Sequence, residues 1–513
     1  MVKIGGKMSG LADIRQIVFE QQQVDLTMDA LKAVDGCYKF LKDFSKNKLI
    51  YGINTGFGPM AQYKIDDADR KQLQFNLIRS HASGTGRLLE PMHTKAMMVA
   101  RLNTLMRAHS GIHQDVVVLL KDLINKEVYP CIFQHGGVGA SGDLVQLAHL
   151  ALVLIGEGEV VYEGKRQSTA KVFKKLDIKP LEMHIREGLA ILNGTSAMTG
   201  VGLVNLLQAY QLLSWEIIMS AMINELVEAY DDSFSKELNQ VKLHDGQNQI
   251  AAAMRKVMKG SKLMKKRHEH LYEKEVTERV LEDKVQEYYS LRCTPQIMGP
   301  VLDTLRFAEK VLVEEFNSVN DNPIIDPAAN NIFHGGNFHG DYVSLEMDKV
   351  KIAITKLSML AERQLNYLLN HNLNRMLPPF VNLGVLGLNF GMQGVQYTAT
   401  STVAENQMLS NPMYVHSIPN NNDNQDIVSM GCNSALICHK VIENAFEVMA
   451  VHLMTIVQAI DYREVAHRLS PMGKEVYDKV RAVFPKFIGD DPRYVDLQNV
   501  KELIIANRYN FFE

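Results

Sequence analysis

The stretch MTGVGLVNLLQAYQLLSWEIIMSAMINELVEA, from Met198 to Ala229, decides the fold of this chain. Its apolar residues cover most of the circumference of a helix, and such a helix must be buried among other helices. Polar residues such as Asn205, Gln211 and Glu216 interrupt it too often for the roughly 20 predominantly apolar residues that a membrane span needs. The stretch therefore predicts a core helix of a water-soluble bundle.

Further long helical patterns extend this prediction. Apolar residues recur at spacings of three and four in residues 115–125, 346–370 and 441–460. Helices this long and apolar need one another's faces, which favours an extended bundle. We therefore predict a mainly α fold, with an N-terminal domain at 1–197 and an elongated helical bundle domain at 198–513. The N-terminal part mixes short helices, Gly-rich turns and one hairpin near Glu157–Gly164.

Composition excludes several classes of protein. The 513 residues carry a formal net charge of −3, so no global basic field attracts nucleic acid or anionic membrane. The basic segment Arg255–His270 is interpreted as a solvated helix and loop. The N-terminal residues contain no apolar signal segment. Five widely spaced cysteines without a CxxC pair indicate reduced thiols in a cytoplasmic protein. The same spacing argues against a zinc site and against a disulfide framework.

The segment HGGVGASGD, from His135 to Asp143, carries the most chemistry. A phosphate-binding P-loop needs a lysine followed by a Ser or Thr hydroxyl, and this pair is missing here. A Gly-rich turn before a core helix is the plainer alternative. A third interpretation is covalent. If the Gly142 nitrogen attacks the Ala140 carbonyl, a five-membered ring closes. Ser141 can then lose water to become an exocyclic methylene, which is a strong electrophile made without metal or added cofactor.

With this segment and several further motifs in the same order, nearly the whole chain resembles the aromatic amino acid lyase family. That family contains histidine, phenylalanine and tyrosine ammonia-lyases and related aminomutases. The resemblance implies a carbon–nitrogen lyase with an ammonia-lyase/fumarase-like architecture. It also implies a 4-methylidene-imidazol-5-one group (MIO), formed autocatalytically from Ala140, Ser141 and Gly142.

Two further motifs supply expected catalytic residues. The loop YGINTGFGP presents Tyr51, and the resemblance implies that Tyr51 is the base and that Gly58 lies at the substrate. A β-proton of an amino acid is barely acidic, so its removal needs a base held within hydrogen-bond reach. In NGTSAMTG, Asn193 is either a helix cap or an amide donor to the prosthetic group or the substrate. The resemblance favours the second role.

The segment VQEYYSLRCTPQ is the next signal. Arg292 offers the bidentate fork that a substrate carboxylate binds. Tyr289 and Gln286 precede it at spacings of three, so the three residues share one face if the segment is helical. The polar face of an ordinary solvated helix would show the same spacing. The resemblance implies a proton relay at Tyr289, a carboxylate clamp at Arg292 and a supporting contact at Gln286.

Two polar loops complete the expected site. The motifs SVNDNPIID and HGGNFHGDY contain Asn322 and Phe338, which the resemblance places against the substrate carboxylate and the prosthetic group. His334 and His339 lie five residues apart without an acidic partner at helical spacing, so ordinary loop hydrogen bonding is expected there. No metal is predicted.

The residues expected to select the substrate point to different amino acids. Ser80-His81 matches histidine ammonia-lyases, whereas Gln425 stands where those enzymes have a glutamate and matches the phenylalanine and tyrosine enzymes. A phenol has one donor and one acceptor, which His81 and Gln425 can satisfy together. Phenylalanine would leave His81 unpaired, at a cost of about 1–3 kcal/mol. L-Tyrosine, giving trans-4-coumarate, is therefore preferred over L-histidine, giving urocanate, and then over L-phenylalanine. An aminomutase and a non-catalytic helical scaffold are two rival hypotheses.

The same resemblance implies a homotetramer whose active sites are shared between subunits. The bundle helices are apolar over more than one face, and the expected site residues are far apart in sequence. The expected partners are a small amino acid substrate and copies of the same chain, with no nucleic acid and no membrane.

Overall fold

The computed structural model describes residues 1–273, 279–281 and 284–512. The chain divides into two compact units, each built from three separate segments. Unit 1 comprises Met1–Leu207, Ala308–Asp348 and Pro412–His439, and unit 2 comprises Gln208–Phe307, Lys349–Asn411 and Lys440–Glu513. The units are thus interleaved in sequence, whereas the division predicted at residue 197 is continuous.

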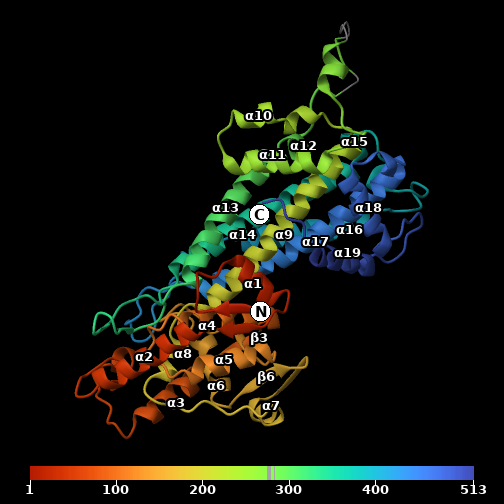
Figure 1. The fold of residues 1–513 in the computed structure, drawn as a ribbon. Coiled ribbons are helices and arrows are strands. Elements are labelled where there is room, and N and C mark those ends of the chain that lie inside the picture. Colours follow the sequence, from red (N-terminus) through yellow and green to blue (C-terminus); the bar gives the residue numbers. More distant parts are fainter. Residues whose placement is uncertain (274–278, 282–283, 513) are drawn as a thin grey trace. The chain divides into compact units, whose positions relative to one another are not determined.

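Unit 1 combines helices with short strands around the Gly-rich loops (Figure 1). Helices α3, α6 and α8 pack against one another, as do α4 and α5. The sheets have two or three strands: β1 pairs with β2 in parallel, and β3–β5, β4–β6–β7 and β8–β9 are antiparallel. The elements are β1 Val2–Ile4, α1 Leu11–Val18, β2 Val24–Leu26, α2 Met28–Phe44, α3 Arg70–His81, β3 Thr85–Leu88, α4 Pro91–Leu105, α5 Asp115–Asn125, β4 Tyr129–Pro130, β5 Phe133–His135, α6 Leu144–Leu154, β6 Glu159–Tyr162, β7 Lys165–Ser168, α7 Thr169–Leu176, α8 Glu187–Leu192, β8 Ile324–Asp326 and β9 Asn331–Phe333.

Four long helices contain four of the five boundaries between the units: α9 Ser196–Leu226, α13 Thr294–Phe316, α14 Asp341–Leu369 and α17 Gly431–Arg463. The fifth boundary lies between Asn411 and Pro412. The remaining helices of unit 2 are α10 Lys236–Gln240, α11 Asp245–Met258, α12 Tyr289–Arg292, α15 His371–Asn374, α16 Gln393–Leu409, α18 Pro471–Val483 and α19 Tyr494–Ala506. The mainly α prediction is confirmed.

The predicted helices correspond closely to α5, α9, α14 and α17. Only α17 differs by much, because it begins ten residues before the predicted start. The predicted hairpin is β6–β7, which turns at Glu163 and Gly164. The short hairpin β8–β9 was missed, because its strands have only three residues each within a polar segment.

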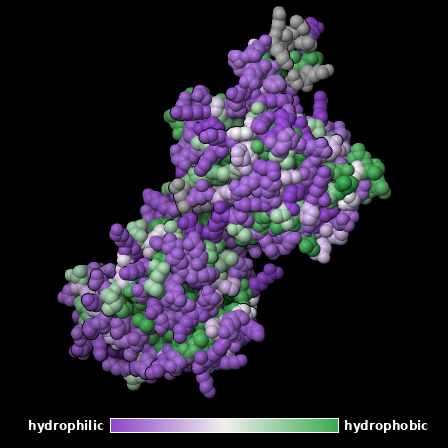
Figure 2. All heavy atoms as spheres, turned by 45° about the vertical axis from the view of Figure 1, so that its right-hand side comes forward, coloured by the Kyte–Doolittle hydropathy of each residue, from purple (hydrophilic) through white to green (hydrophobic). Residues whose placement is uncertain are grey.

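Helices α9 and α17 are long and apolar enough to cross a membrane by composition alone, but 83% and 89% of their most apolar windows are buried inside the protein. That burial is typical of core helices. On the protein surface, polar residues dominate the face seen in Figure 2, and apolar side chains gather there in separate patches.

One carboxyl group in the core of unit 2 makes stability depend on pH. Glu225 is buried, and its Oε1 accepts a hydrogen bond from the Ser470 amide at 2.8 Å. Burial raises the pKa of Glu225 to about 7, although hydrogen bonds from Ser261 and Ser470 act against that rise. The folded protein therefore holds this proton at pH values at which the unfolded chain has released it.

Replacing Glu225 with glutamine is expected to remove this dependence. Between the unfolded pKa near 4.5 and the folded pKa of about 7, rising pH destabilises wild type but not the variant. Between these two pH values, the difference in free energy of unfolding between wild type and Glu225→Gln should change by up to about 3 kcal/mol. Thermal unfolding at pH 5 and pH 8 measures it, with the exposed Glu237→Gln as control. A difference independent of pH would contradict the assigned titration.

Candidate functional site

A cavity of about 620 Å³ in unit 1 brings together most of the predicted site residues. It is formed by the loop that contains Tyr51, helix α3, the Ala140–Ser141 loop, Asn193, the loops that carry Asn322 and Phe338, and the loop before α17. The predicted residues that line it are Tyr51, Gly58, Ser80, His81, Ala140, Ser141, Asn193, Asn322, Phe338 and Gln425. They come from seven separate stretches of sequence, so only the tertiary fold places them together.

The backbone of the Ala140-Ser141-Gly142 segment is strongly bent. Ser141 has a φ of 56° and Gly142 a φ of 82°, both in the left-handed region. A Cβ atom at Gly142 would lie 2.2 Å from the Gly194 carbonyl oxygen, so a side chain at this position would clash. That carbonyl oxygen accepts a hydrogen bond from the Asp143 amide at 2.8 Å, which holds the two loops together.

Two donors converge on the carbonyl oxygen of Ser141. Asn193 Nδ2 donates to it at 2.9 Å, and the Gly194 amide donates at 3.3 Å. Asn193 is only 2% exposed, and its own carbonyl accepts a bond from the buried Arg101 at 2.8 Å. It is the C-cap residue of α8 and not the N-cap of α9, so the alternative interpretation of Asn193 as an N-cap of the long helix is wrong. Donors placed in this way stabilise negative charge on the oxygen that they face.

The Asp143 side chain stabilises the structure around the Ser141 loop. It directly precedes α6, yet its carboxylate caps a different helix, because Oδ2 accepts from the amide of Met198 in the first turn of α9 at 2.8 Å. Asp143 is fully buried, and this burial raises its pKa to about 7 despite the amide bonds. The carboxyl group therefore connects the Ser141 loop to the start of helix α9.

Tyr51 lies at another side of the cavity. Its hydroxyl oxygen accepts a hydrogen bond from the Gly58 amide at 3.2 Å. Gly58 has a φ of 53°, and a Cβ there would lie 2.7 Å from Asn421 Nδ2, which explains why glycine occupies this position. The His334 ring packs edge-on at 6.4 Å from the Tyr51 ring. The tyrosine is thus held by its own loop at the hydroxyl and by a neighbouring loop at the ring.

The predicted selector residues have defined partners. His81 Nδ1 lies 2.9 Å from the carbonyl oxygen of Leu77 and 2.9 Å from the Ser80 hydroxyl oxygen. In the tautomer that donates from Nδ1 to Leu77, Nε2 is an acceptor. Gln425 Nε2 donates to the Ser141 hydroxyl at 3.1 Å. On the other wall, Asn322 Oδ1 accepts from the Gly335 amide at 2.8 Å.

Four predicted residues do not line this cavity. Gln286, Tyr289 and Arg292 belong to unit 2 and line a different pocket. Tyr289 and Arg292 share one helical turn, with the Arg292 guanidinium 5.0 Å from the Tyr289 ring centre. Gln286 lies before this turn, so the single polar helix face predicted for the three residues is wrong, because α12 has only four residues. Gly142 is also absent from the lining, since it faces Gly194.

Several residues that line the cavity were not predicted from the sequence. Helix α3 contributes Leu73, Asn76 and Leu77 beside Ser80 and His81. These residues lie at helical spacings, but the apolar pattern of this helix is too short to predict their shared face. Asn421, Asn424 and Asp426 come from the Asn-rich loop before α17, in which no local pattern distinguishes them. Among the described residues that line the cavity there is no arginine or lysine.

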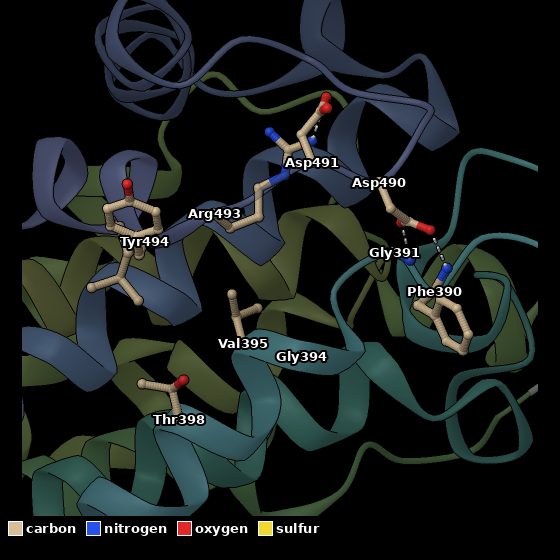
Figure 3. Close-up of a pocket in the computed structure, with 10 residues that line it drawn as sticks. Phe390, Gly391, Gly394, Val395, Thr398, Asp490, Asp491, Arg493 and Tyr494 are labelled. Carbon is tan, nitrogen blue, oxygen red and sulfur yellow. Dashed lines mark hydrogen bonds and ion pairs between the residues drawn. The ribbon is translucent and has the colours of Figure 1, made fainter.

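Another pocket, in unit 2, contains no predicted site residue (Figure 3). The Asp490 carboxylate accepts hydrogen bonds from the amides of Phe390 and Gly391 at 2.9 and 3.1 Å. These bonds lower the pKa of Asp490. The arrangement fixes a surface loop, and it offers none of the chemistry found around Ser141.

The chain is similar to known proteins over nearly its whole length. The profile of the aromatic amino acid lyase family matches residues 10–482. The chain is 38% identical to a tyrosine 2,3-aminomutase from Chondromyces crocatus, over 98% of this chain and 96% of the relative. It is also 38% identical to a histidine ammonia-lyase from Shouchella clausii (strain KSM-K16), over 96% and 95% of the two chains.

The crystal structure of a tyrosine aminomutase from Streptomyces globisporus superposes with a TM-score of 0.95, at 36% identity, over 98% of this chain and 97% of that one. The predicted architecture is therefore confirmed. Since the family profile and full-length relatives agree, this chain is an enzyme of the aromatic amino acid lyase family.

Proposed function

We propose that this enzyme eliminates ammonia from L-tyrosine to give trans-4-coumarate, with an MIO group formed from Ala140, Ser141 and Gly142. The observation that carries the proposal is the pair of donors at the Ser141 carbonyl oxygen, in the same cavity as Tyr51. Relatives support the cofactor, because one from Streptomyces globisporus is named an MIO-dependent tyrosine 2,3-aminomutase.

The residues present fit this group. The left-handed backbone at Ser141 and Gly142 and the absence of room for a side chain at Gly142 suit a compressed segment. Once formed, the group supplies an electron-poor methylene that makes the substrate's ammonia a better leaving group. Asn193 and Gly194 then stabilise negative charge on the former Ser141 carbonyl oxygen.

The chain's own residues account for the proton transfer and for binding of the substrate. Tyr51 is the proposed base for the β-proton, with its oxygen positioned by the Gly58 amide. A phenol hydroxyl can donate to Nε2 of His81 and accept from the amide of Gln425. That amide now donates to the Ser141 hydroxyl, and it becomes available when this hydroxyl leaves as water.

Specificity should respond to these two residues. Gln425→Glu is expected to raise the preference for L-histidine over L-tyrosine, because a carboxylate pairs with an imidazole N–H. A charge-assisted hydrogen bond of about 1.5–3 kcal/mol corresponds to a roughly ten- to hundredfold change. His81→Leu should favour L-phenylalanine, because it removes a polar group that an unsubstituted ring cannot satisfy. The ratios of kcat/KM for the three amino acids measure both effects, and ratios unmoved by either change would place the selector elsewhere.

A tyrosine 2,3-aminomutase is the second candidate, since the Chondromyces crocatus relative carries that name. Histidine ammonia-lyase is the third, supported by Ser80-His81 and by the Shouchella clausii relative. One assay separates them: purified enzyme is incubated with each of the three amino acids, and the products are resolved by chromatography. Coumarate from L-tyrosine supports the proposal. The β-amino acid as main product supports the mutase, and urocanate from L-histidine as the preferred product supports the third candidate.

We further propose a cytoplasmic homotetramer in which a neighbouring chain supplies Arg292, Tyr289 and Gln286 to each cavity. The cavity's described lining has no arginine or lysine for the substrate carboxylate, and Arg292 lies in the other unit. Exposed apolar side chains offer contact surface, among them Val385, Leu386, Leu388 and Phe390 in the loop that Asp490 fixes.

Complementation tests the shared site. Ser141→Ala and Arg292→Ala should each be inactive alone. Co-expressed, they should regain part of the wild-type turnover, because mixed tetramers contain cavities in which both residues are intact. Light scattering should show four chains per particle. No regained turnover in mixed particles, or an active monomer, would contradict the proposal.

A further inference from the structure

Two histidines and a glutamate meet in unit 1, away from the cavity. Glu90 and His93 lie at the start of α4, and His439 belongs to α17. The His93 and His439 rings are 4.3 Å apart between centres, at 74°. The two Glu90 oxygens lie 4.0 Å from His93 Nδ1 and 3.9 Å from His439 Nε2. One potential ligand atom from each residue lies within 4.8 Å of the other two.

We propose that Glu90, His93 and His439 bind a divalent transition-metal ion such as Zn²⁺. Two imidazoles and a carboxylate are a common protein donor set for zinc, which leaves the fourth tetrahedral position to water. Bond lengths near 2.0–2.2 Å place tetrahedral ligand atoms about 3.3 Å apart, so the donors must draw together by at most about 1.5 Å. The Glu90 side chain is 48% exposed and can make that movement.

The surroundings of His93 favour this role over simple packing. His93 is 1% exposed, and every residue after it to the end of α4 is buried. Its Nε2 is buried without a hydrogen-bond partner in the described part of the chain. Burial and the neighbouring His439 lower the pKa of His93, which favours the neutral form of its ring. Neutral imidazole is the form that coordinates metals.

The proposed metal site is expected to stabilise the fold. None of the three residues lines the Ser141 cavity. The bound ion would connect α4 to α17, and the residue before α17, Met430, donates its amide hydrogen to the Val138 carbonyl near Ser141 at 3.1 Å. Metal binding to the folded state alone raises stability. The ion is therefore expected to raise the melting temperature and not to take part in the reaction.

Metal titration of the full-length enzyme tests the proposal. After treatment with EDTA, the protein is titrated with Co²⁺, whose visible absorption reports tetrahedral coordination, and then with Zn²⁺ in competition. One ion per chain and a rise in Tm by a few degrees are expected. His439→Leu should weaken binding at least about a hundredfold and Glu90→Gln about tenfold, since each removes one ligand.

Two controls make the outcome decisive. His113→Gln alters another close histidine pair, His113 and His184 at 4.7 Å, and should leave Co²⁺ binding unchanged. Ser141→Ala should also bind the ion normally, which separates this site from the proposed function. Because Glu90 lies at the surface, Glu90→Gln stays informative even if the histidine variants fail to fold. Absent tetrahedral bands, or an affinity unchanged by Glu90→Gln, would overturn the proposal.

Discussion

Replacing Ser141 with alanine is expected to abolish turnover, with a loss of at least about a thousandfold, while the protein stays folded. The change removes the only hydroxyl from which the electrophile can form. The structural cost is the hydrogen bond from Gln425 to the Ser141 hydroxyl, or about 1 kcal/mol. The measurements are turnover, thermal unfolding and the near-ultraviolet absorbance of the purified enzyme, which should be lost along with activity.

Ser417→Ala is the matched control. It also removes one accepted hydrogen bond, from the Val428 amide at 2.9 Å, in a loop of the same unit. This variant should keep both absorbance and turnover. Substantial lyase activity in Ser141→Ala would exclude a cofactor made from the backbone, whatever the control shows.

Replacing Tyr51 with phenylalanine should lower kcat by about a hundred- to ten-thousandfold, the usual contribution of a general base. The ring and its contact with His334 remain, so KM should change little. Absorbance should persist, because the Ser141 loop is intact, and this distinguishes Tyr51→Phe from Ser141→Ala. The exposed Tyr63→Phe serves as control. A raised KM with unchanged kcat would instead assign Tyr51 to positioning.

Local sequence pattern was sufficient for the long helices. The period of apolar residues predicted α5 and α9 to within a few residues, because helix formation and burial depend on spacing along the chain itself. The three-residue strands β8 and β9 were not predicted, because a pair that short has little periodic signal and is stabilised by its partner.

The functional site likewise has features that the sequence predicted and features that only the fold determines. Motifs and the family resemblance identified Tyr51, Ser141, Asn193 and Gln425 as single residues. Their roles as a group depend on distances, and the bond from Asn193 to Ser141 joins residues that are 52 positions apart. The seven stretches that line the cavity carry no shared period, so no pattern in the sequence indicates that they meet.

From the sequence alone followed a buried helical core and the chemistry available at Ala140-Ser141-Gly142, because both depend on residue types at fixed local spacing. Only the tertiary structure decided which donors face the Ser141 carbonyl oxygen, that Asp143 caps α9, and that Glu90 and His93 meet His439. Such contacts form between segments brought together by burial of apolar surface, and this driving force is non-directional. The final distances are therefore a property of the packed fold, not of any one segment.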